Sequence, residues 1–260
     1  MFEAIRRSGG CAMSLRRDLS RLTDRLNHLR RNEDFTEVIK RGGDRLWVYA
    51  SAPLARIKWR EETFRCDGKS YRYFIHPYNA TWRNERAVEV ALALDFLAQL
   101  GSRSILEVGN VLSHYIGSPR GAHTRTVVDK YEDSADVLNV DILDYQPPAR
   151  FGAFVSISTL EHVGWDESPR KPESVARAFA RIGDLIEVNA PCLVTIPCGY
   201  NDYLDELIRQ EQLPLKKSSF LKRIDEHNRW EQCDGVEALK RKYSRTIGTA
   251  TALYVGRGWE

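Results

Sequence analysis

The sequence predicts an α/β fold built on an open, doubly wound and mostly parallel sheet, with an N-terminal helical and β-hairpin extension. From Ser104 onward, short and nearly unbroken apolar strands alternate with helices, which is typical of a sheet covered on both faces. An Asp-Gly pair upstream indicates a hairpin turn. The chain has 260 residues, 42% of them hydrophobic, enough for one large α/β domain and an appendage. We divide it into residues 1–101 and residues 102–260.

Composition and charge exclude several classes of protein. Lysine and arginine number 39 against 36 aspartate and glutamate, so the formal net charge is +3. No window approaches the ~20 apolar residues that a membrane helix needs. The five cysteines form no C-x-x-C pair, which argues against a secreted disulfide scaffold. Phe2–Ala12 lacks the continuous apolar run of a signal peptide, so we expect a cytoplasmic protein.

Leucines spaced four and three residues apart predict a helix over Ser14–Arg31. This stripe runs from Leu15 to Leu29 and must be buried, either on the protein's own core or on a second copy. A homodimer contact is slightly favoured. Residues 1–45 have a net charge of +4, which leaves −1 for the rest of the chain. Because acidic and basic side chains alternate there, a solvated helix face is favoured over a nucleic-acid contact.

The extension continues with a strand, a hairpin and a helix. Leu46–Ala50 is expected to form a short strand. Thr63–Cys66 and Lys69–Phe74 flank Asp67-Gly68, which suits a type I′ turn because both central residues of that turn need a positive φ. A helix is expected over Asn84–Leu100, where apolar residues recur at helical spacing.

The second half of the chain alternates strands and helices. The expected strands are Ser104–Val108, Arg125–Asp129, Val137–Asp141, Phe151–Ile157, Cys192–Pro197 and Thr249–Val255. Two helices are expected at Pro172–Glu187 and Tyr203–Gln212. Ligands of such sheets bind beyond the carboxyl ends of the strands, so the residues that follow each strand form the candidate site.

An acidic residue lies at or near the C-terminal end of each of the first three expected strands. Asp129 comes 22 residues after Glu107, the spacing that places a carboxylate on ribose hydroxyls, and Asp141 is placed to accept from an adenine amino group. The first loop has one glycine, Gly109, where a pyrophosphate loop needs G-x-G-x-x-G. An adenosine ligand without phosphates fits better. S-adenosylmethionine is such a ligand, and the acidic lining, with Glu161, suits its cationic sulfonium. A dehydrogenase is least favoured.

Four short motifs resemble, in the same order, those of class I S-adenosylmethionine-dependent methyltransferases. They are Ile105–Gly109, Val127–Asp129, Asn139–Asp141 and Ser156–Val163. The resemblance covers about residues 102–256 and implies a Rossmann-like fold with S-adenosyl-L-methionine as cofactor. Longer strings are similar to a bacterial subfamily associated with saccharide modification, which includes mycobacterial sugar O-methyltransferases that act on methylmannose polysaccharides. These strings are His76–Arg86, Glu107–Tyr115 and Glu161–Asp166.

The resemblance also implies roles for single residues. Glu107 and Gly109 would frame the amino-acid tail of the cofactor. Asp129 would bind the ribose, and Asp141 with Ile142 would bind the adenine. Ser158 and Leu160 would lie under the sulfonium by backbone contact, and Arg86 or Tyr78 would hold the cofactor carboxylate. The expected cofactor-binding residues are Glu107, Gly109, Asn110, Asp129, Lys130, Asp141, Ile142, Ser158, Leu160 and Arg86.

A base near the transferred methyl is expected because a sugar hydroxyl is almost wholly protonated near neutral pH. Such a base adds roughly 10²–10⁴-fold to the rate. His162 is the first candidate, since it follows the fourth strand and imidazole titrates near neutrality. Glu161 would orient His162 or stabilise its charge. In the alternative interpretation, His162 only bonds backbone carbonyls and fixes its loop. The reserve candidates are His76, His114, His227 and Asp166.

A divalent metal is a less favoured addition to this site. Some RNA 2′-O-methyltransferases hold a metal ion with Glu-x-x-Glu-His. Here the first position is Ser158, so one carboxylate ligand is missing from the string that ends in Glu161-His162. An ion held by these two residues and a third remains an alternative.

Aromatic and amide side chains predict a saccharide acceptor. The expected acceptor-binding residues are Tyr78, Asn79, Trp82, Trp165, Asp166 and Tyr200. Packing between the hairpin and the sheet is the alternative role for these aromatics. The leading hypothesis is methyl transfer to a hydroxyl of a sugar or oligosaccharide, for example in methylated mannose polysaccharide biosynthesis. The alternatives are a methyltransferase of a small non-sugar metabolite or of RNA, and a non-catalytic S-adenosylmethionine-binding module. The −1 charge of residues 46–260 disfavours RNA.

Overall fold

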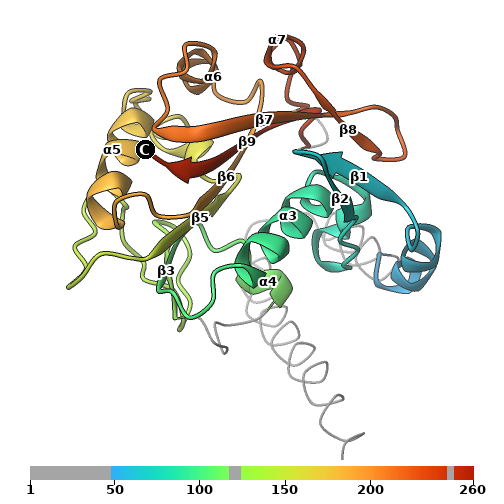
Figure 1. The fold of residues 1–260 in the computed structure, drawn as a ribbon, viewed down its shortest axis with the longest axis horizontal. Helices are drawn as coiled ribbons and strands as arrows, with labels where there is room; N and C mark the ends of the chain where they lie inside the picture. Colours follow the sequence, from blue (N-terminus) through green and yellow to red (C-terminus); the bar gives the residue numbers. More distant parts are fainter. Residues whose placement is uncertain (1–47, 117–123, 245–248) are drawn as a thin grey trace, which may run out of the picture. The chain divides into compact units, whose positions relative to one another are not determined.

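The computed structural model describes residues 48–116, 124–244 and 249–260 (Figure 1). The chain divides into two compact units, residues 1–51 and 52–260. The expected leucine-rich helix, its basic charges and the dimer contact therefore lie outside the described residues. Within the expected strand at 46–50, residues 48–50 are helical, and the helix runs through residues 48–58. That strand prediction is wrong there.

The larger unit contains a seven-stranded mixed sheet in the order β4-β3-β5-β6-β9-β7-β8 (Figure 1). Its strands are β3 (Ile105–Val108), β4 (Arg125–Val128), β5 (Ala153–Ile157), β6 (Cys192–Pro197), β7 (Leu215–Arg223), β8 (Trp230–Cys233) and β9 (Ala252–Trp259). The first four strands of the sheet order are mutually parallel, whereas β9 pairs antiparallel with both β6 and β7. The predicted doubly wound α/β sheet is confirmed, with an antiparallel strand inserted near one end.

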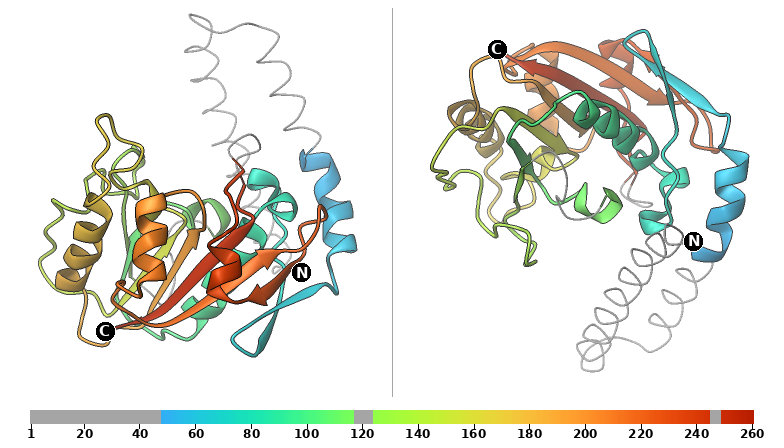
Figure 2. Two further views of the ribbon diagram at one scale, coloured as in Figure 1. Left: turned by 90° about the horizontal axis from the view of Figure 1, so that it is seen from above. Right: turned by 60° about the horizontal axis from the view of Figure 1, so that its bottom comes forward.

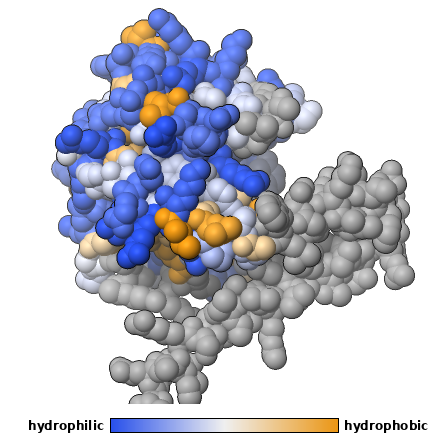
Figure 3. Space-filling model, turned by 90° about the vertical axis from the view of Figure 1, so that its right-hand side faces the viewer, coloured by the Kyte–Doolittle hydropathy of each residue, from blue (hydrophilic) through white to orange (hydrophobic). Residues whose placement is uncertain are grey.

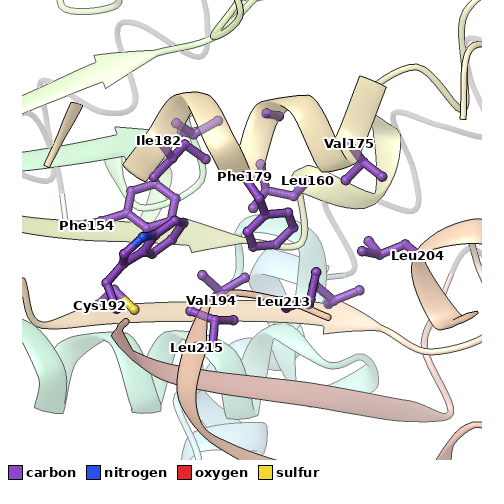
Figure 4. Packing of buried hydrophobic residues seen from close by; sticks show 14 of the residues in the cluster. Phe154, Leu160, Val175, Phe179, Ile182, Cys192, Val194, Leu204, Leu213 and Leu215 are labelled. Atoms are coloured by element: carbon purple, nitrogen blue, oxygen red, sulfur yellow. The ribbon is translucent and has the colours of Figure 1, made fainter. Parts of the chain in front are cut away.

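Alternate residues of the strands point to opposite faces, and each face has its own core. On one face, α5 (Ser174–Leu185) and α6 (Asp202–Arg209) contribute to the first core. Figure 4 shows part of this core, where side chains of β5 and β6 meet those of α5, with Leu204 of α6 nearby. On the other face, α3 (Arg86–Ala98) and the hairpin pack against the sheet. Figure 2 shows α3 and α5 on opposite sides of the sheet.

The hairpin before α3 forms as predicted. Strands β1 (Thr63–Cys66) and β2 (Lys69–Arg72) pair antiparallel around a two-residue turn. In that turn Asp67 has φ 55° and Gly68 has φ 79°, the positive values that a type I′ turn requires. A 3-10 segment, η1 (Tyr78–Arg83), then connects the hairpin to α3.

Two parts of the sheet differ from the expectation. Val137–Asp141 forms no strand, and only one parallel bridge links Val128 to Leu138. Strands β7 and β8 were not expected, because β7 is half exposed and rich in lysine, so it lacks the apolar run of a buried strand.

The face of the molecule in Figure 3 is mainly polar. On the face in Figure 3, apolar residues gather only in a few small patches between hydrophilic ones. Within the described residues, no helix combines the length and apolarity needed to cross a membrane.

Candidate functional site

A cleft of about 230 Å³ lies at the carboxyl ends of the parallel strands. Strand β3 pairs with β4 on one side and β5 on the other, so the strand order reverses there and the fold offers a ligand crevice. The lining residues are Tyr78, Asn79, Arg86, Asn110, Val111, His114, Tyr115, Asp129, Glu132 and Thr159. Five of these were expected in a cofactor or acceptor site, namely Tyr78, Asn79, Arg86, Asn110 and Asp129.

Gly109 brings the loop after β3 into contact with the loop after β5. Its φ is 87°, and a Cβ atom built there would lie 2.0 Å from Thr159 Oγ1. Only glycine allows this approach, because a methyl group would overlap Thr159 in a backbone conformation that other residues avoid. The single glycine of the motif therefore sets the distance between two walls of the cleft.

Asp129 organises the acidic wall of the cleft. One carboxylate oxygen accepts from the Asn110 amide at 3.1 Å, and the other accepts from the amides of Tyr131 and Glu132 at 2.9 Å. The Asn110 side chain donates to Glu132 Oε1 at 2.7 Å. Two carboxylates therefore face the cleft. Glu132 was not anticipated from the sequence, because it does not directly follow a strand. It reaches the cleft through the turn that the Asp129 carboxylate caps.

Glu107 lies beneath the loop and is not part of the cleft lining. It accepts from the Leu112 amide at 2.9 Å, and its other oxygen is 3.1 Å from Arg125 Nη1. Burial raises the pKa of Glu107 to about 7, although the Arg125 guanidinium opposes the shift. The structure thus places this residue where it fixes the fold of the loop over residues 109–112.

Lys130, Asp141 and Ile142 lie to one side of the cleft lining. Lys130 Nζ is 3.0 Å from Asp141 Oδ2 and 2.6 Å from Glu167 Oε1. Hydrogen bonds to these carboxylates, the one to Glu167 first, raise the pKa of Lys130. Asp141 Oδ1 also accepts from the Leu143 amide at 3.0 Å, while Ile142 is buried in the core. The ion pair connects the turn after β4 with the segment that follows the Leu138 bridge.

Aromatic side chains cover the other wall. Tyr78 of η1 stacks on His114 of α4 (Ser113–Ile116), with ring centroids 4.6 Å apart and planes 16° apart. Tyr115 meets Tyr78 edge to face at 5.4 Å. Asn79 has φ 55°, which turns η1 over the cleft. Trp82, expected to bind the acceptor, is partly buried against the α3 core instead.

A second polar cluster follows β5. His162 Nδ1 lies 2.6 Å from Asp166 Oδ2, and the Tyr200 hydroxyl donates to the same oxygen at 2.7 Å. His162 Nε2 is 3.5 Å from Glu161 Oε1. The His162 side chain is 43% exposed, whereas that of Glu161 is 1% exposed. The structure thus brings four predicted residues together. Trp165 lies buried with Arg170 over its ring.

The remaining predicted residues are Arg86, Ser158 and Leu160. Arg86 Nη1 donates to Glu89 of the same helix, so its charge is paired where it lines the cleft. Ser158 is buried and has φ 39°. Leu160, in η2 (Leu160–His162), points its side chain into the core. Only its backbone is therefore available to a ligand.

Burial governs the charge of the carboxyl groups near His162. It raises the pKa of Glu161 well above 4.5, and nearby Glu89 and Glu85 add to the effect. Burial also raises the pKa of Glu85, again with Glu89 adding to the shift. Glu161 Oε1 lies 3.5 Å from His162 Nε2, close enough to orient the imidazole from beneath. In the part of the chain that the structure describes, no three His, Cys, Asp or Glu side chains are arranged to hold a metal ion.

We expect Glu161→Gln to change how stability depends on pH. The folded protein holds the Glu161 proton more tightly than the unfolded chain does. The stabilising contribution of Glu161 to the free energy of unfolding is therefore fully present below pH 4.5 and is lost as the pH rises through the pKa of the folded protein. Glutamine does not titrate. Thermal unfolding of both proteins between pH 5 and 9 should show the variant gaining stability relative to the wild type as pH rises. A difference that stays constant over this range would contradict the prediction.

Methyltransferases are among the solved structures that resemble this chain. No protein-family model matches the sequence, and no curated protein matches it. The N-methyltransferase NodS from Bradyrhizobium japonicum WM9, solved with S-adenosyl-L-homocysteine, is 11% identical, with a TM-score of 0.39 over 68% of this chain and 87% of that one. The 1,6-didemethyltoxoflavin-N1-methyltransferase from Burkholderia thailandensis is 12% identical, with a TM-score of 0.37 over 76% and 100%.

The strand order defines the fold class. Parallel strands β4, β3, β5 and β6 with antiparallel β9 inserted before β7 form a Rossmann-like mixed sheet. Its crevice lies at the expected switch point.

Proposed function

We propose that the protein is an S-adenosylmethionine-dependent O-methyltransferase that acts on a hydroxyl of a sugar or oligosaccharide. One observation carries the proposal. The loop after β5 supplies Thr159 to the cleft and, three residues later, His162 to the cluster with Asp166. A ligand in the cleft and an acceptor beside His162 would therefore meet across one short loop. This is the arrangement that direct transfer between two bound molecules requires.

The residues of the cleft suit an adenosine ligand without phosphates. Asp129 and Glu132 present carboxylate oxygens, which retain lone pairs for hydroxyl donors. Arg86, the arginine in the lining, is already paired with Glu89, so it is poorly placed to neutralise a pyrophosphate. Tyr78 and His114 add aromatic surface. When bound, S-adenosylmethionine would supply the electrophilic methyl group.

The His162 cluster is suited to removing the proton of the acceptor. With a proton on Nδ1, His162 donates to Asp166, and the lone pair then lies on Nε2. Nε2 would accept the proton of the acceptor hydroxyl while its oxygen bonds to the methyl carbon and the methyl–sulfur bond breaks, leaving neutral S-adenosylhomocysteine. Tyr200 donates to the same Asp166 oxygen and holds that carboxylate in place. The histidine is partly exposed, so an acceptor reaches it from solvent.

Aromatic and amide groups at the opening favour a saccharide over other acceptors. Tyr78 is 39% exposed, and Asn79 stands beside it in the cleft lining. Tyr200 lies over the His162 ring, edge to face at 4.7 Å. Such amphipathic rings combine an apolar face with a polar group. We assign the η1 segment of the N-terminal extension to the border of the two sites, where its residues line the cofactor cleft and would also contact the acceptor.

The test is a transfer assay with methyl-labelled S-adenosylmethionine. The protein is incubated with a panel of neutral oligosaccharides, with RNA and with small hydroxylated or amino metabolites, and mass spectrometry locates the label. Label on a sugar oxygen supports the proposal. Label only on RNA, on a small metabolite or on nitrogen would overturn the acceptor class. Binding of S-adenosylhomocysteine without turnover on any acceptor would instead indicate a non-catalytic binding module.

A further inference from the structure

Ser158 adopts an unfavourable backbone conformation at the edge of the cleft. It follows β5 directly, is buried, and has φ 39°, in the left-handed region that residues other than glycine avoid. Its amide still donates to the Thr195 carbonyl at 2.9 Å, as in the last step of the β5–β6 ladder. The chain then turns, so that Thr159 reaches Gly109 and lines the cleft. The position of Thr159 therefore depends on the conformation of Ser158.

Glu89 is the group that holds Ser158 from the opposite side. Its side chain is 0% exposed and accepts hydrogen bonds from three side chains. The Ser158 hydroxyl and the Thr195 hydroxyl both donate to Oε1, the latter at 2.8 Å, and Arg86 donates to Oε2. One buried carboxylate thus connects α3 with the carboxyl ends of β5 and β6. Charge-assisted bonds of this kind are stronger than neutral ones.

We propose that Glu89 is a positioning residue that keeps Ser158 left-handed and so places Thr159 against Gly109 in the cofactor cleft. This inference rests on the proposed function, because it assigns the cleft to S-adenosylmethionine. Glu89 acts through Ser158 and is not a catalytic residue. Its partner Arg86, which does line the cleft, is held by the same carboxylate.

Two substitutions of Ser158 separate conformation from the loss of a hydroxyl. Ser158→Ala and Ser158→Gly both remove the bond to Glu89, but only glycine adopts a positive φ without strain. We expect Ser158→Ala to weaken S-adenosylhomocysteine binding about tenfold, because backbone strain of this kind shifts an equilibrium by that order. Ser158→Gly is expected to stay within about threefold of the wild type. Isothermal titration calorimetry measures both, with thermal unfolding as the check on folding.

A second pair of variants tests Glu89 itself. Glu89→Gln should weaken binding about tenfold, and adding Ser158→Gly should restore at least part of the loss. Equal affinities for Ser158→Ala and Ser158→Gly, in proteins that unfold like the wild type, would overturn the inference even if Glu89→Gln fails to fold. A wild-type protein that binds no S-adenosylhomocysteine would overturn the proposed function and this role together. The two failures are therefore distinguishable.

Discussion

Replacing Gly109 by alanine is expected to lower the free energy of unfolding by about 3 kcal/mol and to abolish S-adenosylhomocysteine binding. Two costs add. Alanine at φ 87° pays the left-handed backbone penalty, and its Cβ would lie 2.0 Å from Thr159 Oγ1 and 2.7 Å from Thr159 Cβ. Thr159 must then move, and the cleft that it lines changes shape. Urea denaturation gives the stability, and calorimetry gives the affinity.

Gly68 provides the matched control for this substitution. It has a similar φ of 79°, but a Cβ built there would meet no atom within 4 Å. Gly68→Ala should therefore pay only the backbone cost, about 1 kcal/mol, and bind S-adenosylhomocysteine as well as the wild type does. If Gly109→Ala proves as stable as Gly68→Ala, the close contact between the two loops does not hold the cleft in shape.

Replacing His162 by alanine is expected to reduce turnover by roughly 10²–10⁴-fold while leaving cofactor affinity unchanged. The imidazole is the group placed to accept the hydroxyl proton, and it lies outside the cleft lining. The effect should therefore fall on kcat and not on the binding of S-adenosylhomocysteine. Single-turnover assays with labelled cofactor measure the first quantity, and calorimetry measures the second.

The neighbours of His162 refine this test. Asp166→Asn keeps the imidazole but removes the carboxylate that fixes its tautomer, so turnover should fall by a smaller factor. Tyr200→Phe removes the hydroxyl that holds Asp166, whereas Tyr203→Phe, on α6, should leave turnover as in the wild type. Unchanged turnover in His162→Ala would assign the histidine to loop structure only.

Much of the sheet and part of the cleft could be predicted because their signals are local. The apolar runs of β3, β5 and β6 are buried on both faces, so their composition alone marks them. Gly109 and Asp129 follow strands at the ligand-binding edge, and the structure places both at the cleft. The hairpin turn was predicted by residues with a strong conformational preference.

The parts that escaped prediction depend on distant contacts. Strand β7 is held by ladders to β8 and β9 and needs no apolar run. At the expected strand Val137–Asp141, the Asn139 side chain donates to the Lys130 carbonyl at 2.9 Å, so that turn is held by a side chain instead of a ladder. Glu89 and Thr159 look like ordinary helix and loop residues in the sequence. Their importance arises from partners 69 and 50 positions away, Ser158 and Gly109 respectively.

The placement of β9 has a consequence for how the protein is made. This strand follows β7 and β8 along the chain, yet it pairs with β6 on one side and β7 on the other. A ribosome-bound chain shorter than residue 252 would leave β6 and β7 with unpaired edges, and such edges invite pairing with other chains. Strand β9 is therefore the last strand to join the sheet during synthesis, and we expect chains truncated before residue 252 to aggregate more readily than the full chain.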